Sequence, residues 1–375
     1  MTGPLSARLR EKRIGVCVGS GGVGKTTLAA ALALGRALEG GKVLVCTIDP
    51  ARRLANALGL ATLGNAETRV PEAALRAAGL EPKGELYAMM LDVKRTWDDL
   101  VARHAPDVER RERIYRNRLY QQLSSALAGS QEYMAMEKLY ELATERDYDL
   151  IVLDTPPTAH ALDFLDAPDR VLDFLGNETA RTLLSPAMSA GKMGLRLFHL
   201  GGTYIAKTIA RFTGAEVLSD LAEFMASFQG MYEGFKARAG VVRALFAQPE
   251  VGFVLVSSAS PRSVDEALFF FERLRKEAMP VAGVVANRVT TELWGEEPLP
   301  GAPALAAALA VHGAGGEELA ERLARTLAEH EVLARADARQ VARLFSAVPG
   351  AQVAVPRLDT DVHELASLAR LAAVL

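Results

Sequence analysis

The chain has 375 residues, of which 50% are hydrophobic, and it carries a formal net charge of −3. These values predict a globular protein of one large or two ordinary domains, and they give no reason to expect a nucleic acid partner. Only two cysteines occur, Cys17 and Cys46, and both lie in apolar runs expected to be buried strands. This usage indicates a reducing, cytoplasmic location and disfavours disulfides or a cysteine zinc site. Neither a signal peptide nor a transmembrane segment is predicted.

The amino-terminal region predicts a β-α-β unit. Residues 1–12 are polar and are expected to be loosely held. Residues 14–18 and 43–48 are apolar runs typical of buried strands, and the alanine-rich and leucine-rich segment 28–39 between them is typical of a helix. This order predicts parallel strands joined by a right-handed crossover, with any ligand at the carboxyl ends of the strands.

A phosphate-binding motif joins the first strand to its helix. Residues 19–27 read Gly-Ser-Gly-Gly-Val-Gly-Lys-Thr-Thr and fit the pattern G-x-x-x-x-G-K-[ST] at every fixed position. Glycines let successive N–H groups converge on phosphate oxygens, and the helix start adds its positive dipole end. The residues predicted to bind the nucleotide are Gly21, Gly22, Val23, Gly24, Lys25, Thr26 and Thr27.

Two of these residues have particular expected roles. Lys25 is expected to reach the β- and γ-phosphates and to act in catalysis, and the Thr26 hydroxyl is expected to bind Mg²⁺. A glycine-rich turn without a ligand is the alternative, and the strand and helix patterns on either side disfavour it.

Two carboxylates follow predicted strands at the edge where ligands are expected. Asp49 comes after the run 43–48 and is therefore expected near the phosphates, with a turn-forming Asp-Pro pair as the alternative. Asp154 ends the apolar run 150–154, where a carboxylate suits Mg²⁺ or its water shell.

The remaining segments extend the same pattern. Short helices are predicted within 53–83, and a solvated helix face explains the charged run 109–118. Further strands are predicted at 86–92, 251–256, 280–287 and 352–356, and further helices at about 264–278, 302–346 and 362–375. The fold class predicted is therefore α/β, a P-loop NTPase with a mostly parallel central sheet flanked by helices. We expect one domain over 1–375 with helical insertions, which form a subdomain, at about 96–146 and 165–245.

The second insertion has an unusual composition. No acidic residue occurs between Thr179 and Ala215, whereas basic residues alternate there with Met, Leu and Phe. Flexible, polarisable methionine suits surfaces that accept varied apolar partners. Such a surface and a helical subdomain that buries these side chains in itself are both open interpretations.

With these motifs in hand, the chain resembles the arsenite-pump and tail-anchored-protein-targeting ATPase family, which are P-loop ATPases with a deviant Walker A motif. Residues 19–27 resemble the phosphate loop of that family, 47–51 its first switch, and 154–160 its second switch. Residues 285–288 resemble the strand end whose asparagine, here Asn287, holds adenine. Residues 128–133 are a looser match to a stretch that precedes a helix in the family.

The resemblance implies ATP and Mg²⁺ as ligands, with Asp49 orienting the attacking water and Asn287 binding adenine. Thr290 stands where related GTPases place an aspartate, which favours ATP. It also implies a homodimer or a heterodimer with a related ATPase, and a hydrophobic protein as a client.

Three departures from the family pattern qualify this expectation. Ser20 stands where the family usually has a second lysine that reaches the partner's nucleotide, so another cation acts, a different subunit supplies one, or hydrolysis is slow. Arg52 replaces the usual histidine of the first switch, and the cysteines that bind arsenite or zinc in relatives have no counterpart.

The function expected is a Mg²⁺-dependent ATPase that couples ATP binding and hydrolysis to dimer closure and to client or partner binding. One alternative is a weakly hydrolysing nucleotide-binding scaffold, or one subunit of a heterodimer in a larger complex. Another is a membrane-surface positioning ATPase, peripheral at the membrane, although the closing helix 362–375 is weakly basic for such an anchor.

Overall fold

The structure is a computed structural model of the whole chain. The residues that it describes are 3–48, 53–105, 107–118, 120–121, 124, 130–155, 166, 169, 173, 224, 232–295, 297–313, 315–358, 360–362 and 364–375.

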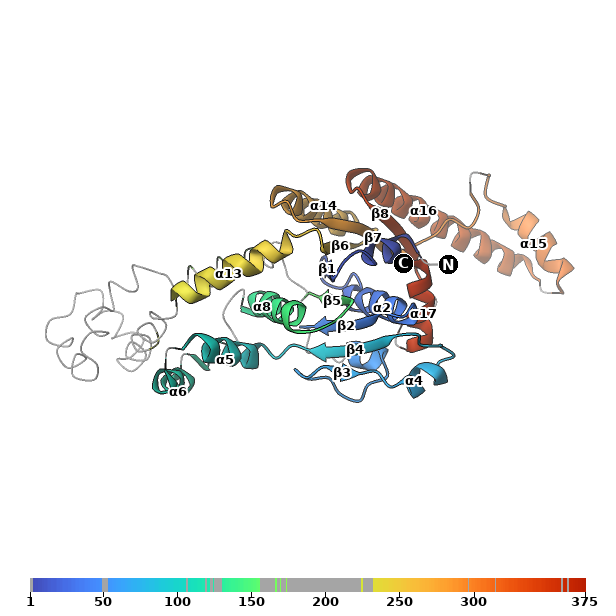
Figure 1. Ribbon diagram of the computed structural model, residues 1–375. Coiled ribbons are helices and arrows are strands. Elements are labelled where there is room, and N and C mark those ends of the chain that lie inside the picture. The colour runs from blue at the N-terminus through green and yellow to red at the C-terminus, as the bar shows by residue number, and fades with distance from the viewer. Residues whose placement is uncertain are drawn as a thin grey trace.

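A single eight-stranded sheet organises these residues, in the order β3-β4-β2-β5-β1-β6-β7-β8 (Figure 1). The strands are β1 Ile14–Val18, β2 Lys42–Thr47, β3 Thr68–Arg69, β4 Glu85–Met90, β5 Leu150–Asp154, β6 Val251–Ser258, β7 Val281–Val289 and β8 Ala351–Pro356. All pairs are parallel except β3 with β4. The predicted class, an α/β fold with a mostly parallel sheet, is therefore confirmed.

Helices cover both faces of the sheet. The described helices are α1 Pro4–Leu9, α2 Lys25–Leu38, α3 Arg53–Ala57, α4 Glu72–Ala77, α5 Val93–His104, α6 Val108–Arg116, α8 Ser130–Glu145, α13 Tyr232–Phe246, α14 Pro261–Lys276, α15 Ala302–Val311, α16 Glu317–Ala347 and α17 Leu365–Val374. One buried cluster joins one sheet face to α1, α2, α3, α4 and α17, and the other joins the opposite face to α5, α6, α8, α13, α14 and α16.

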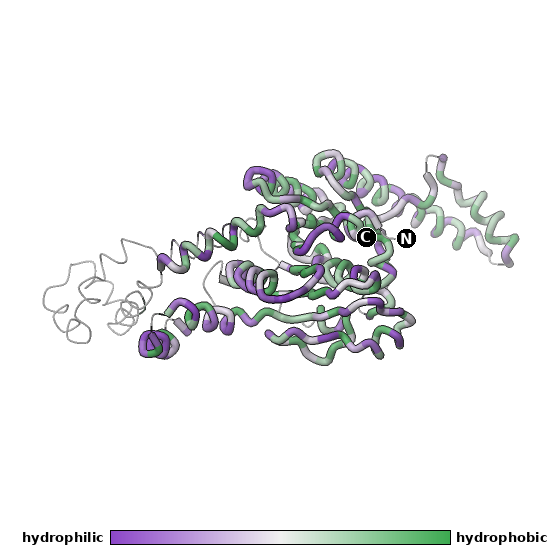
Figure 2. The backbone as a smooth tube through the Cα atoms, viewed as in Figure 1, coloured by the Kyte–Doolittle hydropathy of each residue, from purple (hydrophilic) through white to green (hydrophobic). Residues whose placement is uncertain are grey.

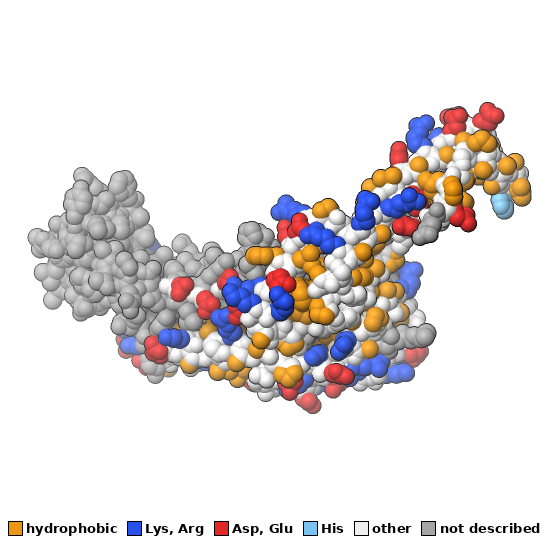
Figure 3. All heavy atoms as spheres, turned by 90° about the horizontal axis from the view of Figure 1, so that it is seen from above, with side chains coloured by type: hydrophobic (Ala, Val, Ile, Leu, Met, Phe, Trp, Pro, Cys, Tyr) orange, Lys and Arg blue, Asp and Glu red, His pale blue; other side chains and the backbone are white. Residues whose placement is uncertain are grey.

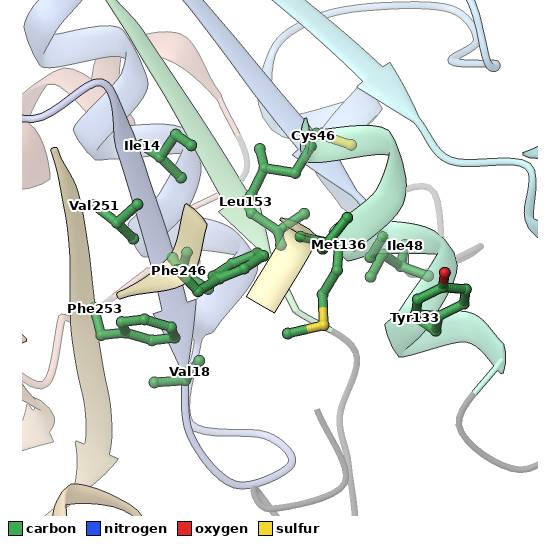
Figure 4. Packing of buried hydrophobic residues seen from close by; sticks show 14 of the residues in the cluster. Ile14, Val18, Cys46, Ile48, Tyr133, Met136, Leu153, Phe246, Val251 and Phe253 are labelled. Atoms are coloured by element: carbon green, nitrogen blue, oxygen red, sulfur yellow. The ribbon is translucent and has the colours of Figure 1, made fainter. Parts of the chain in front are cut away.

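Alternation along β1 and β5 explains why the sheet can be buried on both faces. Ile151 and Leu153 lie in the cluster with α8 and α13, whereas Leu150 and Val152 lie in the cluster with α2. Successive strand residues point to opposite faces, so an unbroken apolar run serves both layers. Figure 4 shows Leu153 with Ile14, Met136 and Phe246 in the first of these clusters, and the tube of Figure 2 is correspondingly apolar along the central strands.

The expectation that residues 1–12 are loosely held is wrong for residues 4–9. They form α1, in which Leu5 and Leu9 are buried, at 0% and 2% exposed. The backbone N–H groups of Leu5 and Ser6 both donate to the carbonyl oxygen of Leu375, at 2.7 and 2.8 Å. Leucines four residues apart lie on one helix face. Here that face packs in the buried cluster that also contains α17. The polarity of the sequence alone does not reveal this packing.

Other predicted elements differ mainly at their ends. The predicted strands occur, but β7 continues to Val289 and α14 already begins at Pro261. The short antiparallel β3 was not predicted, because two residues carry no periodicity. The charged run is a solvated helix as predicted: in α6 Ile114 is buried, and Arg113 pairs with Glu109 at 3.0 Å.

The two predicted insertions are described to different extents. The described helices of the first are α5, α6 and α8, and the described end of the second is α13, which contacts α8. The basic and apolar stretch 180–215, the expected client surface, lies outside the described residues. Within the part of the chain that the structure covers, no helix has the length and apolar character needed to cross a membrane.

The hairpin of α15 and α16 projects from the body of the protein (Figure 1). No residue of α15 is buried, and Figure 3 shows hydrophobic side chains along this projection. The carboxyl-terminal part of α16 packs against α14 and β7, where Leu344 is buried. The base of the hairpin is therefore part of the core, beside the strand that ends at Val289.

Candidate nucleotide site

The carboxyl ends of five neighbouring strands, β2, β5, β1, β6 and β7, meet at one edge of the sheet, because these strands are all parallel. Residues 19–24 connect β1, near the centre of the sheet, to α2 at this edge. Ligands of parallel α/β sheets bind at this edge. The topology therefore places the predicted phosphate loop where a ligand is expected.

Two glycines of the loop are required by close contacts. Gly24 has a φ of +94°, and a Cβ atom there would lie 2.4 Å from Nδ2 of Asn287. A Cβ atom on Gly19 would lie 2.0 Å from the carbonyl oxygen of Val256 on β6. The loop thus packs against β6 and the end of β7. At these two positions a residue with a side chain would clash with its neighbours.

Lys25 is the first residue of α2 and is only 6% exposed. Its ammonium donates hydrogen bonds to the carbonyl oxygens of Gly19 and Ser20, both at 2.9 Å. The charge therefore lies inside the curve of the loop. Thr26 and Thr27 follow in the first turn of the helix and are half-buried, whereas Gly21 and Gly22 are exposed.

Asp154 lies between β1 and β2 at the same edge, in register with Cys17 and Thr47. It is 1% exposed, and its Oδ2 accepts a hydrogen bond from the Thr47 hydroxyl at 2.8 Å. The next residue, Thr155, donates from its hydroxyl to the carbonyl oxygen of Cys17, also at 2.8 Å. The Thr155 bond holds the end of β5 against β1, and the Thr47 bond holds it against β2 and orients the carboxylate.

Both cysteines are buried free thiols. Burial raises the pKa of Cys17 well above its ordinary value, and the charge of Asp154 raises it further. Burial also raises the pKa of Cys46, to about 12. Cys46 and Cys17 lie in the two buried clusters on opposite faces of the sheet, where they act as packing residues.

Asn287, at 9% exposed, joins the end of β7 to the phosphate loop. Its Nδ2 donates to the carbonyl oxygen of Val23 at 2.8 Å, and its Oδ1 accepts from the backbone N–H of Arg288 at 3.0 Å. A primary amide has two donor hydrogens and two acceptor lone pairs. One of each is still available to a ligand, so the predicted contact with adenine is compatible with this geometry and remains a prediction.

We expect Gly24→Ala to destabilise the nucleotide-free protein more than Gly22→Ala does. Both residues have a positive φ, but a Cβ atom on Gly22 would meet nothing within 4 Å, so it serves as a matched control for backbone strain. The added loss for Gly24→Ala is about 1–3 kcal/mol, since Asn287 must move. Urea unfolding measures both, and equal losses would contradict the clash.

The structure brings together most of the predicted site residues and omits others. Lys25, Thr26, Asp154 and Asn287 all lie at this edge. Asp49, the rest of the first switch to Arg52 and the second switch beyond Thr155 lie outside the described residues. Thr47 and Arg288 belong to the sequence motifs 47–51 and 285–288, which predict no role for either side chain. The signal for Thr47 was its place at the end of the strand beside β5, and for Arg288 its place directly after Asn287.

The fold and the loop together define a P-loop nucleotide-binding protein. A profile of the family described as anion-transporting ATPases matches residues 12–297. Because that match covers most of the sequence, the chain belongs to this family, as the resemblance predicted.

Individual relatives match shorter regions. The chain is 30% identical over 150 residues to "ATPase get3" of Aspergillus terreus, 31% over 150 residues to "ATPase GET3A" of Arabidopsis thaliana, and 36% over 168 residues to "Protein Rv2184c" of Mycobacterium tuberculosis. These matches cover 40%, 40% and 42% of this chain. The chain spans only 41%, 36% and 38% of the lengths of these relatives.

Proposed function

We propose that the protein is a Mg²⁺-dependent ATPase that couples ATP binding and hydrolysis to subunit closure and to the binding of a client or partner. The observation that carries the proposal is the buried ammonium of Lys25 inside a glycine loop at the carboxyl edge of a parallel sheet. Membership of the anion-transporting ATPase family supports the same activity.

The donor groups at this edge suit a magnesium nucleotide. The Thr26 hydroxyl and the Asp154 carboxylate are hard oxygen ligands, the type that Mg²⁺ prefers, and a few such groups suffice because phosphates and water complete its shell. The described residues contain no cluster of three or more His, Cys, Asp or Glu side chains that could hold a metal by themselves. When bound, the ion would neutralise phosphate charge, and Lys25 would hold the phosphates in position.

We expect Asp154→Asn to weaken the Mg²⁺ dependence of nucleotide binding by about tenfold or more. The amide oxygen can still accept the hydrogen bond from Thr47, so the change removes charge with little change of shape. Titration of Mg²⁺ at fixed ATP measures the effect, and ATP affinity without Mg²⁺ should hardly change. Asp147→Asn, an exposed residue before β5, is the matched control. Identical Mg²⁺ titrations of the Asp154 variant and wild type would remove this carboxylate from the metal site.

Ser20 favours a second candidate function. Its side chain is neutral and short, so it cannot supply the phosphate contact of a lysine at this position. A protein that binds ATP and hydrolyses it slowly would act as a nucleotide-dependent scaffold, or as one half of a heterodimer. Steady-state ATP turnover by the purified protein, alone and with co-purifying partners, separates these functions from the leading one.

We also propose that the protein forms a dimer and binds a hydrophobic client. The family resemblance alone supports these two parts of the proposal. The client surface would be the basic and apolar stretch 180–215. Hydrogen exchange of that stretch in the nucleotide-free, ADP-bound and ATP-bound protein tests it. Identical protection in all three states would leave the ATPase proposal in place and overturn the client surface.

A further inference from the structure

Arg288 is a cation beside the phosphate loop that the proposed function does not use. It directly follows Asn287 near the end of β7, and its side chain is exposed. Its Nη1 donates to the carbonyl oxygen of Gly22 at 3.2 Å. Lys25 binds loop carbonyls from inside the loop, so the two cations touch the same loop, with Arg288 at its solvent-exposed part.

The backbone at Arg288 has an unfavourable conformation. Its φ is +59°, and Ala278 is the only other non-glycine residue with a positive φ among those described. Such a conformation is costly for a non-glycine residue and persists where surrounding contacts impose it. Here the Arg288 N–H is bound by Oδ1 of Asn287 at 3.0 Å.

Contacts from α16 hold the segment that follows. Oδ2 of Asp337 accepts from the Thr290 N–H at 2.8 Å, and the buried Glu331 accepts from the N–H groups of Leu293 and Trp294 through Oε1, at 2.7 and 3.1 Å. The backbone of Arg288 is thus held on both sides. In this conformation its guanidinium reaches the loop.

The negative charge of a bound nucleotide would attract the Arg288 guanidinium. A triphosphate carries several negative charges, and added cations stabilise the further spread of charge during phosphoryl transfer. The loop contains Lys25 as a cation, whereas Ser20 is neutral, and its buried hydroxyl oxygen has no hydrogen-bond partner among the described residues. A guanidinium is permanently charged and presents several N–H donors in a fork that matches phosphate oxygens. Its exposed bond to a neutral carbonyl can be exchanged for a bond to phosphate.

We propose that Arg288 is the second phosphate-binding cation of this site and binds the polyphosphate chain of ATP at the rim of the loop. This inference rests on the proposed ATP binding. The phosphates belong either to the nucleotide on the same chain or to one on a second copy that faces the loop, and the chemistry of recognition is the same.

The test compares Arg288→Gln, which keeps the side-chain length and removes the charge, with Arg288→Lys and with wild type. A hydrogen bond to a charged group contributes about 1.5–3 kcal/mol, so ATP affinity should fall roughly 10-fold to 100-fold in the Gln variant. ADP affinity should fall less, AMP affinity should not change, and the Lys variant should retain part of the ATP affinity. Arg275→Gln, an exposed residue near the carboxyl end of α14, is the control.

A second substitution tests the role of the charge directly. Adding Ser20→Lys to Arg288→Gln should restore part of the lost ATP affinity, because it returns a cation to the loop. Loss of affinity at every protein concentration assigns the phosphate to the same chain. Sedimentation shows the protein concentrations at which ATP-bound chains associate. A loss of ATP affinity confined to those concentrations assigns the phosphate to a second copy.

Three results would overturn the proposal. Unchanged ATP affinity in Arg288→Gln would do so, and so would equal losses for ATP, ADP and AMP together with a lower melting temperature, which indicate a purely structural role. If wild type binds no nucleotide, both this inference and the proposed function fail. Normal wild-type binding with an unaffected variant overturns this inference alone.

Discussion

Lys25→Ala should abolish ATP binding, with an affinity at least about 100-fold below that of wild type, which corresponds to about 2.8 kcal/mol. The ammonium of Lys25 is buried and hydrogen-bonded to Gly19 and Ser20 within the loop. Alanine removes the positive charge from the position where the phosphates are expected. The other cation that the described residues place on the loop, Arg288, contacts its exposed part at Gly22 and does not occupy this position. Equilibrium binding of a fluorescent ATP analogue measures the loss, and turnover should fall with it.

The control for this variant must separate loss of charge from loss of folding. Lys276→Ala, at the exposed end of α14, removes a lysine without touching the loop. Thermal unfolding without nucleotide should show that the Lys25 variant is folded. The ammonium bonds carbonyls of its own loop, so its removal should leave the packing of the sheet intact. A folded Lys25→Ala protein that binds and hydrolyses ATP like wild type would refute the phosphate-loop assignment.

Asp49→Asn should keep ATP affinity within a few-fold of wild type while turnover falls by about two orders of magnitude or more. Asp49 follows β2 by two residues, and the end of β2 is fixed beside Asp154 by the hydrogen bond from Thr47. If the Asp49 carboxylate lies near the γ-phosphate, it can orient and polarise the attacking water molecule, whereas an amide lacks the negative charge needed for this. Orientation of the nucleophile affects the transition state and hardly affects ground-state binding.

Single-turnover hydrolysis alongside equilibrium binding distinguishes the two effects. Asp147→Asn again serves as the control for removal of one negative charge. Equal turnover by Asp49→Asn and wild type would exclude Asp49 from the mechanism. A parallel loss of binding and turnover would instead assign it to nucleotide binding. Together, Lys25→Ala and Asp49→Asn distinguish a residue needed to bind the phosphates from a residue needed only for hydrolysis.

The amino-acid sequence alone determined the local units of the site. An apolar strand, a glycine loop and an alanine-rich helix are each specified by neighbouring residues, so Lys25 and Thr26 could be placed before any tertiary contact was known. Asp154 could be placed at a strand end for the same reason. The fold class followed too, because alternating strands and helices favour a parallel sheet.

Only the tertiary structure decided which of these units meet. Thr47 and Asp154 are 107 residues apart, and Asn287 and Arg288 reach the phosphate loop across 264 and 266 residues. The strand order that places β1 between β5 and β6 comes from pairings of this range. Sequence periodicity reports which face of an element is buried and not which partner buries it. The packing of α1 against the carboxyl terminus and the hydrogen bond from Arg288 to Gly22 depend on that long-range pairing, so local sequence patterns could not predict which partners these residues contact.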